Sequence, residues 1–139
     1  MSVNICAGLR RLFAPLSVLL MLSSPALAQD PVFGMWQTEP DRKDLTSHIL
    51  IGPCDGKICG KVMQAFNSAG QMVRTANVGR QLFWGIEPAG NGSYDNGRVF
   101  IPLMNVEARA KMTLLDQNRL RVTACKAMVC DGQVWVRIQ

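Results

Sequence analysis

Two short segments of this sequence place a cysteine on each side of a tight connection, and this repeated arrangement restricts the possible fold most strongly. In the first segment, Cys54 and Cys59 flank a short stretch that begins with Asp55-Gly56. In the second, Cys125 and Cys130 flank a stretch of the same length near the C-terminus. The residues on both sides are rich in Val, Ile and Leu. Both segments are therefore predicted to be β-hairpins.

The spacing also predicts how these cysteines pair. Because a short hairpin connection puts its flanking positions opposite one another, we expect the disulfides Cys54–Cys59 and Cys125–Cys130. Structural zinc sites usually use C-x2-C pairs, so the wider C-x4-C spacing makes zinc the weaker alternative and no metal site is predicted. The sequence has no C-x-x-C motif, which disfavours disulfide-exchange chemistry.

The N-terminus is typical of a secretory signal peptide. A pair of arginines precedes an apolar run over residues 12–21, and Ala26-Leu27-Ala28 offers a small-residue cleavage site. The run is too short to remain as a membrane anchor. We therefore expect a signal peptide over residues 1–28 and one exported domain over residues 29–139, periplasmic or secreted. Cysteine pairs suit that oxidising compartment.

The positive charge of the chain is modest once the signal peptide is set aside. The full sequence carries 15 basic and 10 acidic residues, and loss of Arg10 and Arg11 leaves a net charge of +3. The bases are scattered, and no basic stretch is interleaved with aromatic residues. Nucleic-acid binding is therefore not expected. An ordinary solvated surface is the simpler interpretation, and weak attraction to anionic envelope surfaces is the alternative.

Alternating hydrophobicity predicts an all-β domain. The clearest case is Val106 to Leu114, where apolar residues at every second position alternate with charged and polar ones. Strands are predicted at 32–39, 45–51, 58–66, 80–87, 97–103, 106–114, 119–125 and 133–138. Eight strands at hairpin spacing favour an antiparallel up-and-down barrel, since closure removes the sheet edges. Asn67–Gly79 is predicted to be a long loop, either a surface excursion or a lid.

Several short motifs resemble one bacterial family. They are Gly34-x-Trp36, Cys59-Gly60-Lys61-Val62, Ala108-x-Ala110-Lys111-Met112, Leu120-x-Val122-x-x-Cys125 and Gln133-x-Trp135-x-Arg137. Together with the signal peptide they resemble the DUF2147 family of small exported proteins, and the resemblance covers nearly all of the mature chain. It implies a lipocalin-like fold. The family often has a longer, proline-rich segment after the third strand, which the shorter Asn67–Gly79 segment lacks.

The Gly34-x-Trp36 motif is similar to the first lipocalin signature. In lipocalins that tryptophan plugs the closed end of the barrel, and an arginine of the last strand packs on its ring. The resemblance therefore implies that Arg137 lies on Trp36 as a structural plug. A guanidinium over an indole face contributes about 0.5–2 kcal/mol, depending on its desolvation.

No residue pattern predicts catalysis. His48 is the single histidine, and it is expected to make an ordinary hydrogen bond on a strand. The sequence shows no serine nucleophile motif and no phosphate-binding glycine loop. We therefore expect no enzyme activity, no catalytic residue and no cofactor. A hydrolase with carboxylates assembled in space is a remote alternative.

Two functions remain open. In the first, the barrel binds a small apolar or amphipathic molecule between inward-facing residues of several strands, namely Val62, Leu82, Trp84, Ile86, Ala110 and Met112. In the second, the barrel is packed and its surface contacts an envelope protein, as an interaction or inhibitor module. The cysteine-bounded loops Asp55–Ile58 and Lys126–Val129 would then be rigid contact points, with Met128 and Val129 exposed for binding. An interior cavity would favour the first function, and a filled barrel with an exposed apolar patch would favour the second.

Overall fold

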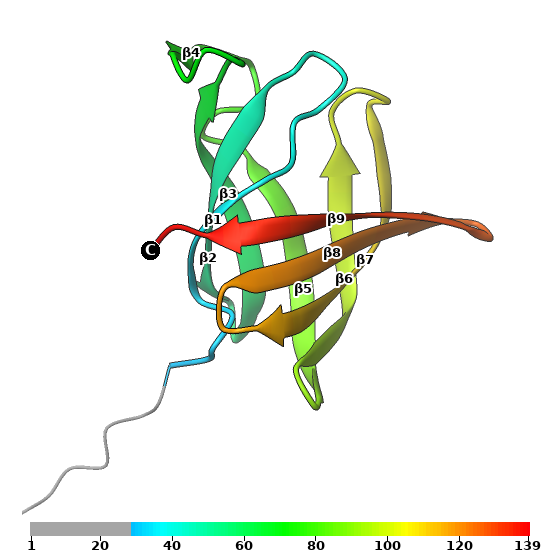
Figure 1. Ribbon diagram of the computed structural model, residues 1–139. Helices are drawn as coiled ribbons and strands as arrows, with labels where there is room; N and C mark the ends of the chain where they lie inside the picture. The colour runs from blue at the N-terminus through cyan, green and yellow to red at the C-terminus, as the bar shows by residue number, and fades with distance from the viewer. Residues whose placement is uncertain (1–28) are drawn as a thin grey trace, which may run out of the picture.

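The computed structural model describes residues 29–139, which form one antiparallel β-barrel (Figure 1). The predicted signal peptide lies outside these residues. The strands are β1 Gly34–Gln37, β2 Thr46–Cys54, β3 Lys57–Phe66, β4 Met72–Val73, β5 Gln81–Gly90, β6 Ser93–Ile101, β7 Val106–Asp116, β8 Arg119–Lys126 and β9 Val129–Arg137. No helix of residues 29–139 is long and apolar enough to cross a membrane.

Eight of the strands close into a ring, as the sequence predicts. Each pairs with its neighbour in the chain, β4 excepted, and β1 pairs with both β2 and β9. The two-residue strand β4 pairs only with the end of β3, so it lies outside the ring. The segment 67–79, expected to be a plain loop, therefore begins with a small hairpin. Asn67 holds that turn, because its side-chain oxygen accepts hydrogen bonds from the backbone N–H groups of Ala69 and Gln71.

Both predicted disulfides are present, Cys54–Cys59 and Cys125–Cys130. The hairpins that contain them are tighter than expected, because the strands continue past the cysteines. The pairs Cys54 with Lys57 and Lys126 with Val129 leave two-residue turns. Asp55 and Gly56 both adopt positive φ, at 50° and 75°, as a tight primed hairpin turn requires.

The predicted turn over residues 88–96 is mostly strand. Gly90 of β5 pairs with Ser93 of β6, so only Asn91-Gly92 connects the two strands. These two residues have φ angles of 55° and 72°, and Asn-Gly is the preferred sequence for such a turn. The remaining glycines and polar residues belong to the twisted strand ends and to a bulge before Gly97.

Strand β5 departs from the predicted alternation at Trp84, although Ile86 faces inward as expected. In β5, Gly85 has a φ of 70° between Trp84 and Ile86, and such a bulge shifts the alternation. Phe83 and Ile86 consequently face inward, while Trp84 lies across from the exposed Arg98 on the outer wall.

In β9, Trp135 is 4% exposed and Val136 is 51% exposed. The inward face of this strand therefore carries Trp135, and Val136 lies on the outside. Its V-W-V sequence is apolar on both faces, so alternation alone does not determine which side is buried. The large indole of Trp135 goes inward, where its backbone partner Leu120 is also buried.

The two ends of the barrel differ. One end, which we call the plugged end, carries the turns at 55–56, 91–92 and 117–118 together with residues 30–33. The other end, the loop end, carries the connections 38–45, 67–80, 102–105 and 127–128. In Figure 1 the orange β8–β9 hairpin extends sideways well beyond the strands next to it.

Candidate functional site

The plugged end is built around Trp36 and Arg137. These residues are backbone partners in neighbouring strands, so the first and last strands meet there. The Trp36 side chain is fully buried, and its indole N–H donates a hydrogen bond of 2.9 Å to the Val32 carbonyl. The Arg137 guanidinium carbon lies 4.2 Å from the centre of the Trp36 ring. The contact expected from the lipocalin resemblance is therefore present.

Arg137 also binds three backbone carbonyls around this end. Its Nε donates to Gln117 at 2.6 Å, and its Nη1 donates to Phe33 at 2.8 Å. Its Nη2 donates to the carbonyl of Pro31. One guanidinium thus ties the last strand to the N-terminal lead and to the β7–β8 turn, which gives Arg137 a structural role.

The N-terminal lead seals the same end. Val32 is fully buried, and the Tyr94 hydroxyl donates a hydrogen bond of 2.7 Å to the Asp30 carboxylate. Burial of the phenol, followed by its contact with the Asp30 carboxylate, raises the pKa of Tyr94. The first strand was predicted to begin at residue 32, but it begins at Gly34. Val32 instead belongs to the core before the first strand begins, and Phe33 packs against the core.

The six residues predicted to line a ligand pocket do not all lie inside the barrel. Four of the six, Val62, Ile86, Ala110 and Met112, are buried inside the barrel. Leu82 is partly buried against the core. Trp84 is on the outer wall, so it cannot line an interior pocket. The predicted set is therefore not a single cluster.

Large side chains inside the barrel lie against glycine backbone. A β-carbon at Gly60 would overlap the ring of Phe83, and one at Gly97 would overlap the side chain of Ile86. Both of these large residues are fully buried. The largest fully buried side chains are Trp36, Phe83, Ile49, Ile51, Ile86, Met112, Leu120 and Val32.

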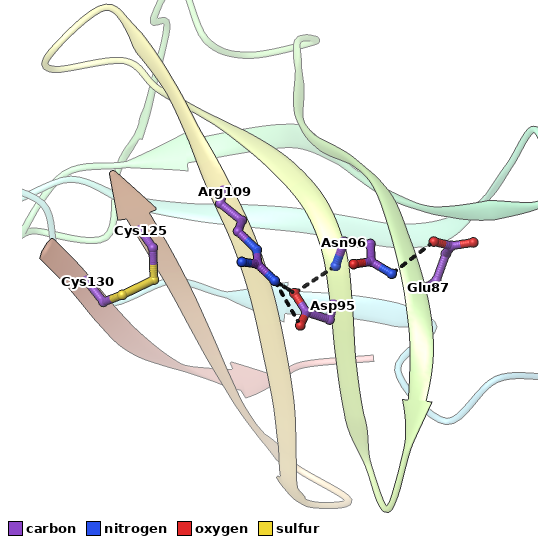
Figure 2. A network of polar contacts seen from close by, with 6 residues as sticks. All are labelled: Glu87, Asp95, Asn96, Arg109, Cys125 and Cys130. Carbon is purple, nitrogen blue, oxygen red and sulfur yellow. Dashed lines mark hydrogen bonds and ion pairs between the residues drawn. A yellow bond between two sulfur atoms is a disulfide. The ribbon is translucent and has the colours of Figure 1, made fainter. Parts of the chain in front are cut away.

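A hollow of about 560 Å³ lies on the outer wall of β6, β7 and β8. Basic side chains and acidic side chains line it, and the Cys125–Cys130 hairpin forms one border. Its residues are Asp95, Arg98, Glu107, Ala108, Arg109, Lys111, Cys125, Lys126, Ala127 and Cys130. Figure 2 shows Arg109 beside the disulfide, reaching toward Asp95 on the neighbouring strand.

A chain of polar contacts fixes the charged groups of this hollow. Arg109 Nη2 lies 3.3 Å from both carboxylate oxygens of Asp95. The backbone N–H of Asn96 donates to Asp95 at 2.7 Å, and the Asn96 side chain donates to Glu87 at 3.3 Å (Figure 2). The Asn96 hydrogen bond, helped by the charge of Arg109, lowers the pKa of Asp95. This carboxylate is therefore ionised at neutral pH and holds Arg109 in place.

A second hollow, of about 490 Å³, lies at the loop end between the β1–β2 connection and the β3–β4 turn. His48 borders it, with its ring centre 4.5 Å from that of Phe66 and its Nε2 3.3 Å from Gln37 Oε1. Burial lowers the pKa of His48. The histidine makes the ordinary hydrogen bond on a strand that was expected from the sequence.

Sequence reasoning missed the outer hollow as a site. The available signal was the pair of basic residues at alternate positions, Arg109 and Lys111, which both line the hollow. Alternation predicts that these two residues share the solvent-exposed face of their strand. It does not predict that Arg98 and the β8–β9 turn come to the same place, because that depends on the barrel's curvature.

The closed eight-stranded ring with a tryptophan–arginine plug at one end defines a lipocalin-like fold. The solved structure of protein HP1028 from Helicobacter pylori, described as belonging to the lipocalin family, is similar with a TM-score of 0.63 and 12% sequence identity. The match covers 81% of this chain and 85% of that chain. The low identity means that this likeness concerns the fold alone.

The chain belongs to the DUF2147 family, whose description is "uncharacterized protein conserved in bacteria", and residues 34–137 match it. The family resemblance seen in the sequence motifs is thereby confirmed. No match to a curated protein was found.

Proposed function

We propose that this protein is exported and acts through the outer surface of a packed lipocalin-like barrel, as an interaction module of the bacterial envelope. The observation that carries the proposal is the close packing inside the barrel, where the buried side chains of Phe83 and Ile86 occupy the space above Gly60 and Gly97. Ligand-binding barrels need an unfilled interior with a few convergent polar groups. Among residues 29–139 no polar or charged side chain is buried, and both hollows described above lie on the outside.

The exposed groups support the same proposal. Met128 is 98% exposed and Val129 is 75% exposed at the tip of the β8–β9 hairpin, where the nearby disulfide restrains the turn. A rigid apolar tip loses little conformational entropy when it is buried by a partner. We place the working face on the β6–β8 wall, next to this tip.

This proposal is tested by measuring whether the barrel takes up small molecules. Native mass spectrometry of the protein recovered from the periplasm is expected to give the bare polypeptide mass, and addition of N-phenylnaphthylamine is expected to produce no saturable fluorescence. The matched variant is Met112→Trp, at a fully buried position. Saturable probe uptake by the natural protein that Met112→Trp abolishes would show an interior site and contradict the proposal.

Binding of a small apolar molecule is the second candidate function. Its support is the likeness to a protein described as a lipocalin and the small inward residues Ala65, Ala108 and Ala124 on β3, β7 and β8. The uptake experiment separates the two candidates. No catalytic role or cofactor is part of either proposal.

Export makes a prediction of its own. The protein recovered from the periplasm is expected to begin at Gln29, because cleavage after Ala28 satisfies the small-residue rule of signal peptidase sites. N-terminal sequencing checks this. Replacing Ala26 and Ala28 with larger residues is expected to leave the full-length precursor. Recovery of an uncleaved natural protein would contradict the signal-peptide assignment.

A further inference from the structure

The positive charge of the domain is concentrated on one wall. Residues 95–126, which span β6 to β8, contain six basic and three acidic residues. The rest of the domain, residues 29–94 and 127–139, has seven of each and is neutral. The wall formed by β6, β7 and β8 therefore carries the whole net charge of +3. Opposite charges across a contact steer and orient association.

Ion pairs neutralise only half of the bases on this wall. Arg98 pairs with Glu107, Arg109 with Asp95, and Arg119 with Asp116. Within residues 29–139 the other three bases, Lys111, Arg121 and Lys126, have no ion-pair partner. All three are exposed. These three cations are available to an external anion.

Apolar residues project beside this charge. Lys126 and Ala127 line the basic hollow, and the next two residues are the exposed Met128 and Val129. On the other side, the β6–β7 turn exposes Leu103 and Met104. The wall thus combines cations with two apolar turns, both at the loop end of the barrel. A soluble polyanion would bind only the basic side chains and would leave the apolar turns exposed to water.

From this combination we infer that the β6–β8 wall docks on an anionic lipid bilayer, with Met128 and Val129 inserted among the lipids and Lys111, Arg121 and Lys126 facing phosphate groups. Apolar insertion together with basic attraction is the general basis of reversible binding to an anionic membrane surface. The Cys125–Cys130 disulfide holds the inserting turn in shape before contact. The inference rests on the proposed function, since it assigns a partner to the same outer wall.

The test is co-sedimentation of the mature protein with phosphatidylcholine vesicles, prepared with and without phosphatidylglycerol. We expect binding only to the anionic vesicles, and weaker binding as salt is added. Met128→Asp is expected to lower the affinity by about tenfold, because it removes an apolar side chain from the lipid. Lys126→Gln is expected to lower it by about fivefold, the effect of one basic residue near the membrane surface.

Matched controls come from elsewhere on the barrel. Met72→Asp changes a methionine that is 64% exposed on β4, and Lys61→Gln changes an exposed lysine of β3. Both controls should bind the vesicles like the natural protein. Equal binding to neutral and anionic vesicles, or equal losses from test and control variants, would overturn the inference.

Binding to heparin without binding to vesicles would also overturn it and would indicate an acidic macromolecule instead. The proposed packed barrel is judged separately by probe uptake. If the protein binds neither vesicles nor the probe, the membrane inference is refuted. The proposed surface module would then have a different partner. Probe uptake would refute the packed barrel whatever the vesicles show.

Discussion

Replacing Trp36 with alanine is expected to lower the free energy of unfolding by about 3–5 kcal/mol, as large-to-small changes of buried aromatic residues do. The reason is specific to the plugged end. Trp36 is fully buried, its indole N–H binds the Val32 carbonyl, and its ring carries the Arg137 guanidinium. The variant loses all three contributions and leaves a cavity where the first and last strands meet. Urea unfolding followed by far-ultraviolet circular dichroism measures the change.

The matched control is Trp84→Ala. It makes the same chemical change, but Trp84 is only partly buried and lies on the outer wall across from Arg98. We expect this variant to lose clearly less stability than Trp36→Ala. Equal losses would show that the plug has no special role, and an unchanged midpoint for Trp36→Ala would contradict it outright.

The parts of the fold that could be predicted from the sequence are those where one pattern dominates. In β7 the apolar positions Ala108, Ala110 and Met112 alternate with Glu107, Arg109 and Lys111, so only one arrangement buries the apolar face. All three apolar residues are buried as expected. The two disulfides could also be predicted from the sequence, since the hairpin spacing brings the cysteines of each pair together.

Prediction failed where the backbone departs from regular alternation. In β5 the residues Leu82, Phe83 and Trp84 are all apolar, and the positive φ of Gly85 decides which of them face inward. Glycine adopts positive φ easily, but a glycine in a strand sequence can also have the ordinary extended conformation. The sequence alone therefore does not predict a bulge at this position. The sequence therefore predicted Trp84 to line an interior pocket, although it lies on the outer wall. The prediction of an interior ligand site lost one of its six residues for this reason.

The outer hollow could not be predicted for a different reason. Alternation places Arg109 and Lys111 on the solvent-exposed face of their strand. Charged residues are usual on such a face, so their presence there does not indicate a functional site. The hollow depends on the β8–β9 hairpin extending beyond its neighbours and on Asp95 holding Arg109 by two contacts of 3.3 Å. Both features come from pairing between strands, including the bulge between Tyr94 and Gly97. Local sequence does not contain that information.

The second large effect is expected for Gly60→Ala, which should cost about 1–3 kcal/mol of stability, the usual range for overpacking a core. A β-carbon there would overlap the ring of Phe83, which is fully buried and packed in the core. Gly52→Ala is the matched control. It lies in the adjacent strand β2, its backbone partner is Cys59, and nothing lies within 4 Å of an added β-carbon. We expect it to be close to neutral.

A double variant locates the source of the loss. If the Phe83 ring is the obstacle, Gly60→Ala combined with Phe83→Leu should be more stable than the sum of the two single changes predicts, with a coupling of about 0.5–3 kcal/mol between contacting residues. Additive losses would place the strain elsewhere. A neutral Gly60→Ala would mean that Phe83 moves aside easily, which requires unfilled space inside the barrel. That outcome would favour a small apolar ligand over the surface module, so one stability measurement bears directly on which function the barrel performs.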